Sequence, residues 1–593
     1  MKEKWVVTAK RADFGAISRT FGITPVLARL MVNRDVNSEE MMRKYLWGDE
    51  RDLYDPSTMK DILKARDLIM EAVETGESIA VASDFDVDGI MSGFILHKGF
   101  TRIGGRCKIY TPDRVAEGYG LNMRIVDEAL DDGCGVIVTC DNGIAAFEAV
   151  EYARAKGLKV IVTDHHDIPF EEDENGRHPL YVPANAIVNP KQADCAYPFK
   201  KLCGAGVAFK LLCLLYDAYD IPEDEKFGLM EYTAIATVAD VMDLQDENRI
   251  MVKKGLKMLA HTKNEGLKAL IQICQLNPSK ISAYHIGFVL GPCFNAAGRL
   301  DTVKIALDLL METDPAEAAK KASALKELNE SRKNLTVKGF EQAVEKIENS
   351  GIKEDKVILV KLENCHESLV GIIAGRIKEK YHRPTLVFTD VGDGRIKGSG
   401  RSIEAYNMFE ELTVQKPLLE RFGGHPMAAG LTLKAENLEP LRLALNTQTT
   451  LTAQDLIPVV RIDVPMPVGY ITKEFVKELE LLEPFGKGNV KPVFAEKYFS
   501  VLRARVLGKN KNVLKLQVMN DDKKVMDAIY FGDIPAFETF IESEFGVCEK
   551  EKMFNGEKNN VTIALTYYPD LNEYMGVESI QIVVTGYCRI LRK

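Results

Sequence analysis

Between residues 78 and 165 the chain alternates short apolar runs with longer amphipathic stretches. Four of the apolar runs have the length and composition of buried strands: "SIAVAS", "CKIYTP", "GVIVTC" and "KVIVT". The stretches between them have helical spacing, and two of them stop at Gly133 and Gly157, as helices do. Strand and helix in regular succession predict a parallel sheet with right-handed crossovers, which is the core of an α/β domain.

The pattern changes after residue 204. Residues 205–312 are mainly helical in pattern, and the charged stretch that follows predicts one long helix. Thr313 or Asp314 can cap its start, Pro315 suits its first turn, and Gly351 ends it. Such a helix is about 50 Å long at about 1.5 Å per residue. A charged helix of this length is more typical of a connection between domains than of a core.

Alternation resumes near residue 356, where "KVILVKLE", "LVGIIAGRIKEKY" and "TLVFTD" predict a second α/β domain. We interpret the next stretch, "GDGRIKGSGRS", as a flexible Gly-rich loop. The tail contains short strands such as "NVLKLQVM" and "SIQIVVTGY" and predicts a small β-barrel or sandwich. Residues 1–60 carry no motif, and we expect them to cap the first domain. The predicted boundaries are 1–60 for this segment, 61–312 for the first α/β domain, 313–350 for the long helix, 351–450 for the second α/β domain and 455–593 for the β-rich tail.

The amino-acid composition says more about the cellular compartment of the protein than about its function. A length of 593 residues predicts three or four domains at roughly 150 residues each. The net charge, 77 minus 87 or −10, argues against a nucleic-acid partner unless a basic groove is local. Eleven cysteines without a C-x-x-C pair favour reduced thiols in the cytoplasm. No window approaches about 18 uninterrupted apolar residues and the start lacks an apolar signal segment, so we expect neither a membrane span nor a secretory signal.

Carboxylate and imidazole side chains follow the predicted strands of the first domain or close an apolar stretch. They are Asp84 and Asp86 in "SDFDVDG", Asp141 in "VTCDNG", His165 and His166 in "VTDHH", and Asp240 in "TVADVMD". Ligands of parallel sheets collect beyond the carboxyl ends of the strands, so these groups are expected to converge. Oxygen ligands with one or two imidazoles suit hard divalent cations, and the pattern therefore predicts two metal ions acting on a phosphate ester.

Two other interpretations of these motifs are weaker. The run Asp84, Asp86, Asp88, Gly89 resembles the start of a calcium loop, but such a loop needs a glutamate where Ile95 stands, and the flanks are strand and helix. Alternatively the residues are unrelated turns and caps, with Gly89 giving the backbone freedom to enter a helix. Four acidic motifs at successive element ends disfavour that alternative.

The same motifs resemble a known superfamily. "DFDVDG", "CDNG", "DHH" and "ADVMDL" are similar to the four motifs of the DHH phosphoesterases. Further segments, in order from about residue 60 to 495, resemble the RecJ family of single-strand-specific exonucleases: "PDRVAEGYGL", "LCGAGVAFKL", "FNAAGRLD", "CHESLVGIIAGRI", "KGSGRS" and "FGGHPMAAG". The resemblance implies an α/β parallel-sheet DHH domain and a second α/β domain, DHHA1, joined by a long helix. It also implies a C-terminal β-barrel of the OB-fold type.

The resemblance also implies roles for the metal ligands. One ion, Mn²⁺ or Mg²⁺, would be held by Asp86, Asp141, His165 and Asp240, and the other by Asp84 and Asp141, which would bridge the two. His166 would sit over the scissile phosphate as a substrate ligand or proton donor. Asp88 either orients a ligand or is the turn residue before Gly89. Imidazole content favours Mn²⁺.

Substrate contacts are implied in the same way. Ser399, Arg401 and Arg114 resemble the pocket that recognises the 5′ end, whereas "GSGRS" alone would equally be a turn with a solvated arginine. Arg299 is a further phosphate candidate. Gly424 and His425 are implied to contact the substrate. Cys293 stands where the family often has arginine, which removes one possible backbone contact.

Basic and aromatic residues also alternate in the tail. The basic ones include Arg503 and Arg505, and the aromatic ones are Tyr498, Phe499, Tyr530 and Phe531. They suit a track for a single strand, although aromatic residues in the core of a barrel explain the same pattern.

The pattern and the resemblance together predict a metal-dependent 5′-to-3′ exonuclease of DNA repair and recombination. It would convert single-stranded DNA into nucleoside 5′-monophosphates, in a cleft between the α/β domains too narrow for a duplex. The resemblance implies a cytoplasmic protein with a single-strand-binding protein and a helicase as partners. Two alternatives remain open. One is a DHH phosphodiesterase of nanoRNA, pAp or cyclic dinucleotides, and the other is a non-catalytic replication scaffold.

Overall fold

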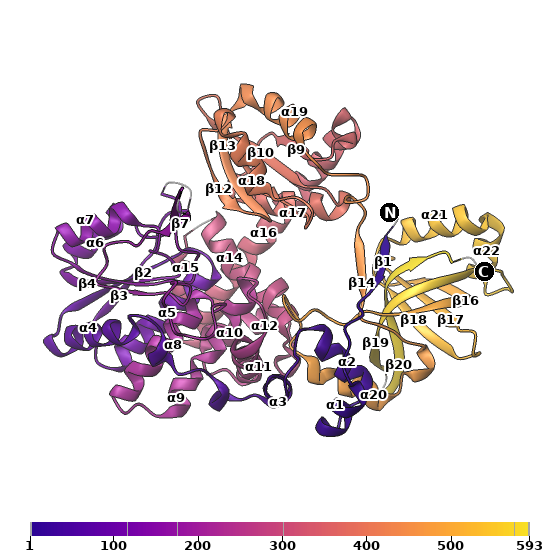
Figure 1. The fold of residues 1–593 in the computed structure, drawn as a ribbon, viewed down its shortest axis with the longest axis horizontal. Coiled ribbons are helices and arrows are strands. Elements are labelled where there is room, and N and C mark those ends of the chain that lie inside the picture. The colour runs from indigo at the N-terminus through magenta and orange to yellow at the C-terminus, as the bar shows by residue number, and fades with distance from the viewer. Residues whose placement is uncertain (1–2, 115–116, 175, 301, 575, 591–593) are drawn as a thin grey trace. The chain divides into compact units, whose positions relative to one another are not determined.

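The computed structural model describes residues 3–114, 117–174, 176–300, 302–574 and 576–590, and these form two compact units. One unit, here called the central unit, comprises Glu50–Pro458. The other, the terminal unit, combines Glu3–Asp49 with Val459–Lys593. In Figure 1 the terminal unit therefore contains both the indigo start and the yellow end of the chain.

The central unit begins with a five-stranded, wholly parallel sheet in the order β3-β2-β4-β5-β8. The strands are β2 (Ser78–Ser83), β3 (Cys107–Tyr110), β4 (Cys134–Cys140), β5 (Lys159–Thr163) and β8 (Ala186–Val188). The helices beside it are α4 (Ile62–Thr75), α5 (Val87–Arg102), α6 (Met123–Asp131), α7 (Phe147–Ala155) and α8 (Gly204–Ala218). The predicted parallel α/β domain is confirmed.

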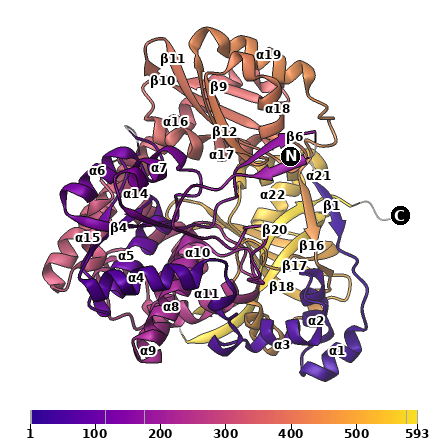
Figure 2. The ribbon, with the colours of Figure 1, turned by 60° about the vertical axis from the view of Figure 1, so that its left-hand side comes forward.

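Helices cover both faces of this sheet. Successive side chains of a strand point to opposite faces, so Ile79 and Val81 of β2 pack in one apolar core with α4, α5 and α8. Ala80 and Ala82 pack in a second core with α6 and α7. Figures 1 and 2 show these two helix layers from different directions, with the sheet between them.

A helical region follows the sheet and leads into one long helix. The helices are α9 (Glu223–Gly228), α10 (Met230–Ala239), α11 (Asp246–Leu259), α12 (Glu265–Ile273), α13 (Ala283–His285), the π-helix η4 (Ile286–Leu290), α14 (Gly291–Leu300), α15 (Lys304–Met311) and the long α16 (Pro315–Glu348). Asp314 caps α16 by accepting hydrogen bonds from the backbone of Ala316 and Glu317.

The long helix α16 joins two cores. Ala322 and Leu325, in its first half, pack with the helices of the first domain, whereas Ala343 and Ile347, near its end, pack with the second α/β domain. The predicted connecting helix is therefore confirmed, and it ends at Glu348, three residues before Gly351.

The second α/β domain has a mixed sheet in the order β12-β13-β11-β10-β9, in which only β9 and β10 run parallel. Its elements are β9 (Ile358–Leu362), α17 (Val370–Tyr381), β10 (Thr385–Gly392), β11 (Arg395–Arg401), α18 (Met408–Val414), β12 (Arg421–His425), β13 (Ala428–Lys434) and α19 (Leu438–Gln448). Residues of α16 and α17 pack in one core with this sheet, and residues of α18 and α19 pack in another.

The Gly-rich stretch, interpreted above as a flexible loop, is mostly strand β11, which lies in the middle of this sheet. A Cβ atom at Gly398 would lie 2.4 Å from the ring of Phe388, and one at Gly400 would lie 2.2 Å from the sulfur of Met408. The glycines therefore make room for side chains that pack on the strand. The flexible-loop interpretation is wrong for residues 395–401.

The terminal unit is built on a closed five-stranded barrel, because β16 pairs with both β17 and β19. The barrel strands are β16 (Phe494–Leu507), β17 (Val513–Met519), β18 (Val525–Tyr530), β19 (Thr562–Tyr574) and β20 (Val577–Cys588). Helices α21 (Ile534–Phe545) and α22 (Val547–Asn555) connect β18 to β19. The predicted C-terminal barrel is confirmed.

Residues 3–49 belong to this barrel unit, whereas we had expected residues 1–60 to cap the first α/β domain. They form β1 (Lys4–Val7), α1 (Phe14–Phe21), α2 (Pro25–Asn33) and α3 (Glu39–Trp47). Strand β1 pairs in parallel with β14 (Val459–Ile462), and Leu27, Leu30 and Met31 of α2 share an apolar core with barrel residues such as Phe494 and Tyr567.

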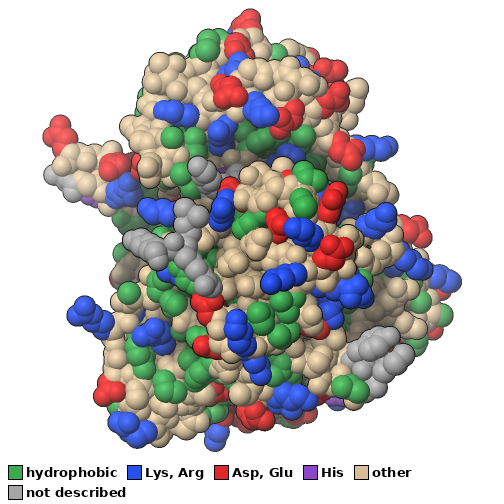
Figure 3. Space-filling model, turned by 90° about the vertical axis from the view of Figure 1, so that its right-hand side faces the viewer, with side chains coloured by type: hydrophobic (Ala, Val, Ile, Leu, Met, Phe, Trp, Pro, Cys, Tyr) green, Lys and Arg blue, Asp and Glu red, His purple; other side chains and the backbone are tan. Residues whose placement is uncertain are grey.

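Charged side chains of both signs are interspersed on the face of the molecule that Figure 3 shows. Across the described ranges, no helix combines the length and the apolar character needed to cross a lipid bilayer.

Candidate metal and phosphate site

The predicted metal ligands meet at the carboxyl edge of the parallel sheet. Asp84 and Asp86 follow β2, Asp141 follows β4, and His165 follows β5, and these strands are neighbours in the sheet. Asp240 ends α10 as its C-cap residue. Ligand atoms within 4.8 Å of one another form three groups: Asp141, His165 and His166; Asp88, His165 and Asp240; and Asp84, Asp86 and Asp141.

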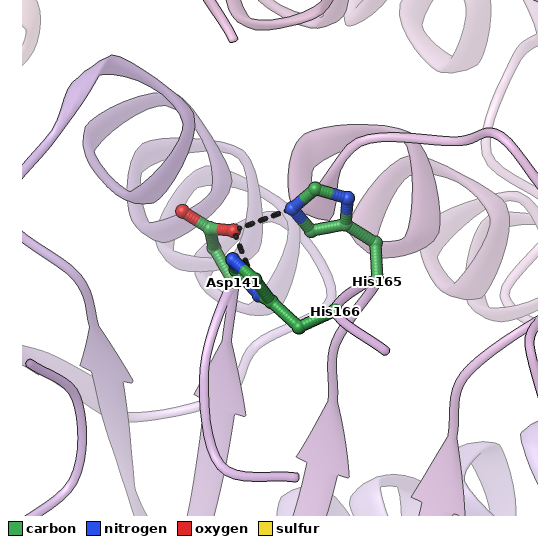
Figure 4. Close-up of side chains that lie close together, drawn as sticks. All are labelled: Asp141, His165 and His166. Carbon is green, nitrogen blue, oxygen red and sulfur yellow. Dashed lines mark ion pairs between the residues drawn. The ribbon is translucent and has the colours of Figure 1, made fainter. Parts of the chain in front are cut away.

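Asp141, like His165, belongs to two of these three groups. Figure 4 shows one oxygen of its carboxylate facing both imidazoles, and this Oδ1 lies 3.1 Å from His165 Nε2 and 3.9 Å from His166 Nδ1. Its φ of 62° lies in the left-handed region, which aspartate tolerates better than most residues but which still costs free energy. A strained conformation held in place at the end of a buried strand is typical of a functional site.

The charges of this cluster require a counter-charge. Burial, followed by the negative charges of the neighbouring carboxylates, raises the pKa of Asp141 well above its ordinary value, and burial together with Asp86 does the same for Asp84. Burial lowers the pKa of His165 to about 4, so its imidazole is neutral near pH 7. Divalent cations are the counter-charge that carboxylates and neutral imidazoles hold best.

Unsatisfied polar atoms point to the same ligands. Oδ1 of Asp141 and both ring nitrogens of His165 are buried and make no hydrogen bond. Buried polar atoms almost always have a partner, so these three atoms are suited to metal coordination. Carboxylate oxygens mixed with imidazole nitrogen fit Mn²⁺ or Mg²⁺.

Asp86 belongs to a different group from the one expected. It lies with Asp84 and Asp141, whereas His165 and Asp240 lie with Asp88. The reason is local: Asp86 is the N-cap of α5, and its Oδ1 accepts hydrogen bonds from the backbone of Asp88 and Gly89. A Cβ atom at Gly89 would lie 2.5 Å from the carbonyl oxygen of Asp84, so glycine is needed there for close approach and not for backbone freedom.

Asp88 is buried and firmly held. Its two carboxylate oxygens accept hydrogen bonds from the backbone N–H groups of Gly204 (2.6 Å) and Ala205 (2.7 Å), at the start of α8, where the helix dipole favours an anion. Its Oδ2 also lies 3.6 Å from His165 Nε2. A Cβ atom at Gly204 would lie 2.6 Å from the Cβ of Asp141, so this glycine lets α8 approach the metal ligands.

Two residues that the sequence analysis did not single out hold His166. Buried Asp164 accepts hydrogen bonds from the backbone of His165 and His166, and lies 2.8 Å from His166 Nδ1. Burial works in the opposite direction, but Asp164 raises the pKa of His166 to about 9. The hydroxyl of Tyr119 donates to the carbonyl of Asp141 and lies 3.0 Å from His166 Nδ1. His166 is therefore a positioned imidazolium beside the cluster.

The charges of three other arginines act on Arg299, next to the carboxylates. The guanidinium of Arg114 lies 4.6 Å from the ring centre of Phe85, and its pKa is lowered by burial but raised by Asp84 and Asp86. Burial, followed by the charges of Arg114, Arg332 and Arg401, lowers the pKa of Arg299 to about 9. Such a cluster of half-buried cations is stabilised by a bound anion, and phosphate groups are the anions that arginine pairs with best.

Arg332 was missed because it lies in the charged run of α16, where nothing in the sequence separates it from surface residues. In the structure its Nε and Nη2 atoms donate to the side-chain oxygen of Asn329, a buried residue on the same helix. Nδ2 of Asn329 lies 3.4 Å from the sulfur of Cys293, which is itself buried. Cys293 therefore faces the long helix, close enough to Arg332 of that helix to raise the pKa of its guanidinium against the lowering effect of burial.

Ser399 and Arg401 lie in β11 opposite the start of α17. Nη1 of Arg401 donates to Ser399 Oγ (3.1 Å). A Cβ atom at Gly371 would lie 2.9 Å from Ser399 Oγ and 3.1 Å from Arg401 Nη2. A hydroxyl, a guanidinium and the N-terminus of a helix thus surround one point, an arrangement that suits a phosphate. The alternative of a solvated arginine on a turn is wrong, because Arg401 is largely buried in a strand.

Gly424 and His425 lie apart from these contacts, in the exposed edge strand β12. His425 is close enough to Asp167 to influence it: a hydrogen bond from Lys191 and the charge of His425 both lower the pKa of that carboxyl. Asp167 follows the His165–His166 pair directly, so β12 comes near the end of this motif.

The expected aromatic track of the tail is largely part of the barrel core. Phe499 is fully buried, and the ring of Tyr530 packs against Phe537 and Tyr587. Phe531 is exposed, and the ammonium of Lys491 lies 3.8 Å from the ring centre of Tyr568. Phe499 and Tyr530 therefore fit the core interpretation, whereas Phe531 does not.

Comparison with known proteins gives matches along most of the chain. Residues 78–238 match the family model described as the DHH family N-terminal domain, residues 354–449 match the DHHA1 domain, and residues 462–586 match the RecJ OB domain. The single-stranded-DNA-specific exonuclease RecJ of Bacillus subtilis is 35% identical over 92% of this chain and 69% of its own length. The protein of the same name from Salmonella typhimurium is 32% identical over 98% and 99%.

Solved structures show similar folds. RecJ from Thermus thermophilus in complex with Mn²⁺ matches 99% of this chain and 80% of its own, with a TM-score of 0.81 and 24% identity. A crystal structure of exonuclease RecJ bound to manganese matches 67% of this chain and 98% of its own, with a TM-score of 0.56 and 29% identity.

Proposed function

The chain belongs to the RecJ family of single-stranded-DNA-specific exonucleases, and we propose that it degrades a single DNA strand from its 5′ end. It is a metal-dependent hydrolase, with Mn²⁺ or Mg²⁺ as cofactor. The products we propose are nucleoside 5′-monophosphates, released one at a time.

One observation supports the proposal above all: unsatisfied metal-ligand atoms lie beside a cluster of arginines. Asp141 Oδ1 and the His165 nitrogens have no hydrogen-bond partner, and Arg114 is drawn electrostatically to the carboxylates of Asp84 and Asp86 next to them. Cations would hold the scissile phosphate, and the arginines would hold a second phosphate of the same strand. A polyanion with regularly spaced phosphates fits both.

Asp84, Asp86, Asp141, His165 and Asp240 would hold the cations, with Asp141 shared between them. Two bound divalent cations supply charge neutralisation at the phosphate and an activated water molecule. Asp88, bonded to the start of α8, would lie beside the cations, because its Oδ2 is 3.6 Å from the same His165 nitrogen that faces Asp141.

His166 would supply the proton of the reaction. Water attacks the phosphorus, the bond from phosphorus to the 3′ oxygen of the terminal nucleotide breaks, and this oxygen leaves with a proton. The imidazolium of His166, held by Asp164, is the acid positioned to give that proton.

The pocket of Ser399, Arg401 and the start of α17 would bind the 5′-terminal phosphate, with Arg114 and Arg299 between this pocket and the cations. A strand bound at both points has its scissile bond fixed one nucleotide from the end. The enzyme would therefore release one nucleotide with each cleavage. His425 and Gly424 would contact the strand from the exposed edge of β12.

Digestion of labelled strands tests the proposal. With Mn²⁺, a 5′-labelled 30-mer should release labelled mononucleotide from the first time point, whereas a 3′-labelled strand should shorten gradually. A chelator should stop both reactions, and a blunt duplex should resist. Shortening that begins at the 3′ end, or hydrolysis confined to dinucleotides, would contradict the proposal.

The alternatives from the sequence are less well supported. A phosphodiesterase of nanoRNA, pAp or cyclic dinucleotides does not need the match of residues 462–586 to the RecJ OB domain. A non-catalytic scaffold does not need the converging ligands of Asp141 and His165.

The proposed function also suggests partner proteins and a cellular location. We propose a single-strand-binding protein and a helicase as partners, because a single strand must first be exposed for the enzyme to act. A cytoplasmic location is supported by the cysteines, all eleven of which are free thiols.

A further inference from the structure

Two stacked aromatic side chains of the central unit are strongly exposed. Tyr284 of α13 is 63% exposed and Phe288 of η4 is 68% exposed. Their rings stack on each other, with centroids 4.9 Å apart and planes at 27°. Exposed aromatic rings that touch each other form an apolar surface, and such surfaces mark contact sites more often than chance exposure does.

These rings continue a stripe of residues that ends at the arginine cluster. The exposed or half-exposed positions of α13, η4 and α14 include Tyr284, Phe288, Pro292, Asn295 and Arg299. Their spacing of four, four, three and four residues places them along one face of the helical segment. The stripe therefore runs from the aromatic pair to Arg299.

Helix α14 runs past the metal ligands between these two points. A Cβ atom at Gly291, its first residue, would lie 3.4 Å from the side chain of Ala239, which precedes Asp240. A Cβ atom at Gly298 would lie 2.5 Å from the carbonyl oxygen of Phe85, which lies between Asp84 and Asp86. These positions are about 10 Å apart along the helix. The arginine end of α14 thus lies by one metal-binding motif and the aromatic end by another.

The aromatic end has two further unusual features. Val241, next to Asp240, is 60% exposed and has a φ of 55°, which a β-branched residue rarely adopts. Phe288 lies in a π-helix, a rare element that is frequent at functional sites. Gly287 of this π-helix faces Val238, one turn of α10 before Val241. The strain and the exposed apolar surface thus occur together.

We propose that Tyr284 and Phe288 are a stacking platform for bases on the 3′ side of the scissile phosphate. This inference rests on the proposed function. The 5′-terminal nucleotide would lie at the Arg299 end of the stripe, so the rest of the strand must leave past the other end. Stacking accepts every base, because each has an aromatic face. The platform would therefore hold the incoming strand without sequence preference.

Binding measurements on a chain made inactive by Asp141→Asn test the inference. Single strands with 2-aminopurine at successive positions report stacking by loss of fluorescence. We expect quenching at internal positions close to the 5′ end, and recovery of the fluorescence when Tyr284→Leu and Phe288→Leu are added. The leucines keep the apolar surface but remove the aromatic faces.

Affinity and turnover give a second readout. The two leucine substitutions should weaken binding of a 20-mer about 5- to 100-fold. Turnover of a dinucleotide, which ends before the platform, should stay within twofold of the unsubstituted chain. Tyr284→Phe with Phe288→Tyr should restore the affinity. Phe409→Leu is the matched control, because Phe409 is an exposed ring of the same unit and also lies against another ring.

The outcomes separate the two proposals. Unchanged 20-mer affinity and unchanged quenching in the leucine variants would overturn the platform, while the unsubstituted enzyme would still degrade single strands. Equal losses on 20-mer and dinucleotide would also overturn it, since they indicate damage to the site. If the unsubstituted enzyme fails to degrade single strands, the proposed function itself falls.

Discussion

Asp141 combines a left-handed backbone, complete burial and an unsatisfied oxygen atom within a group of carboxylates. The buried charge and the unsatisfied oxygen cost stability in the absence of a cation and are compensated when one binds. The features that suit Asp141 to metal binding thus destabilise the metal-free protein.

Replacing this carboxylate should separate the two effects. In a chelator, Asp141→Asn should raise the midpoint of thermal unfolding, because it removes one of several repelling charges. Mn²⁺ at 100 times its Kd should stabilise the unsubstituted protein by about 2.7 kcal/mol, and the variant much less. Exonuclease activity should fall at least about 100-fold. Asp194→Asn, at an exposed ion pair with Lys60, is the control. A variant that gains as much stability from Mn²⁺ as the parent would refute this assignment.

His166 offers a test of proton transfer. His166→Ala should slow hydrolysis of ordinary DNA about 10²- to 10⁴-fold, as expected for the loss of a general acid. A strand whose leaving 3′ oxygen is replaced by sulfur needs no proton, so the variant should cleave it at nearly the parent rate. Equal defects on both strands, measured by product release, would instead assign His166 to substrate binding.

At the scale of residues, short sequence motifs at the ends of elements were enough to predict which side chains converge. Asp84, Asp141, His165 and Asp240 follow strands or close a helix, and these ends converge in the structure. Tyr119 and Arg332 could not be found in this way. Each reaches the site through the placement of a loop or a long helix, and its neighbours in sequence carry no sign of that placement.

At the scale of elements, the start of α17 and strand β11 form the phosphate pocket together. Gly371→Ala should fill part of this pocket, because the new methyl group would displace Ser399 Oγ and Arg401 Nη2. The preference for a 5′-phosphorylated over a 5′-hydroxyl strand should fall about tenfold or more. The helix itself should gain roughly 0.5–1 kcal/mol.

Gly375→Ala is the matched control for this change, since it lies on the same helix with nothing within 4 Å of the added atom. It should stabilise the helix without altering the rate ratio of the two strands. A similar change of preference in both variants would show that helix stiffness, and not pocket filling, is responsible.

Strands and helices were predicted correctly where the apolar periodicity was clear. They were missed where contacts with other elements determine which residue type fits. The buried strand β2 and the long helix α16 have the predicted type and nearly the predicted ends. Strand β11 was missed because its glycines resemble a loop. Glycine is needed at these positions because the ring of Phe388 and the sulfur of Met408, which belong to other elements, pack directly on the strand.

At the scale of the whole molecule, the chain is arranged as one unit inserted into another. Leu30→Ala should destabilise the terminal unit by about 2–5 kcal/mol, because Leu30 is fully buried in the core shared by α2 and the barrel. Calorimetry should show one unfolding transition for each unit, and Mn²⁺ should shift only that of the central unit. The substitution should lower the temperature of the other transition and leave dinucleotide hydrolysis unchanged. Leu443→Ala, at an exposed leucine, should have little effect. Movement of the Mn²⁺-dependent transition would contradict this division.

The shared core of residues 3–49 and 459–593 could not be predicted. Apolar periodicity identifies the buried face of α2 but not the partner that covers it. That partner is more than 400 residues away in sequence, and only the parallel pairing of β1 with β14 and the packing of Leu27 and Met31 reveal it.

This arrangement has a consequence during translation. Helices α1 to α3 are translated before the barrel strands that share their apolar core. At roughly 5–20 residues per second, about 400 intervening residues leave those faces bare for something like 20–80 s. A nascent chain in this state is a natural client for a chaperone, and a truncated product would never bury its own beginning.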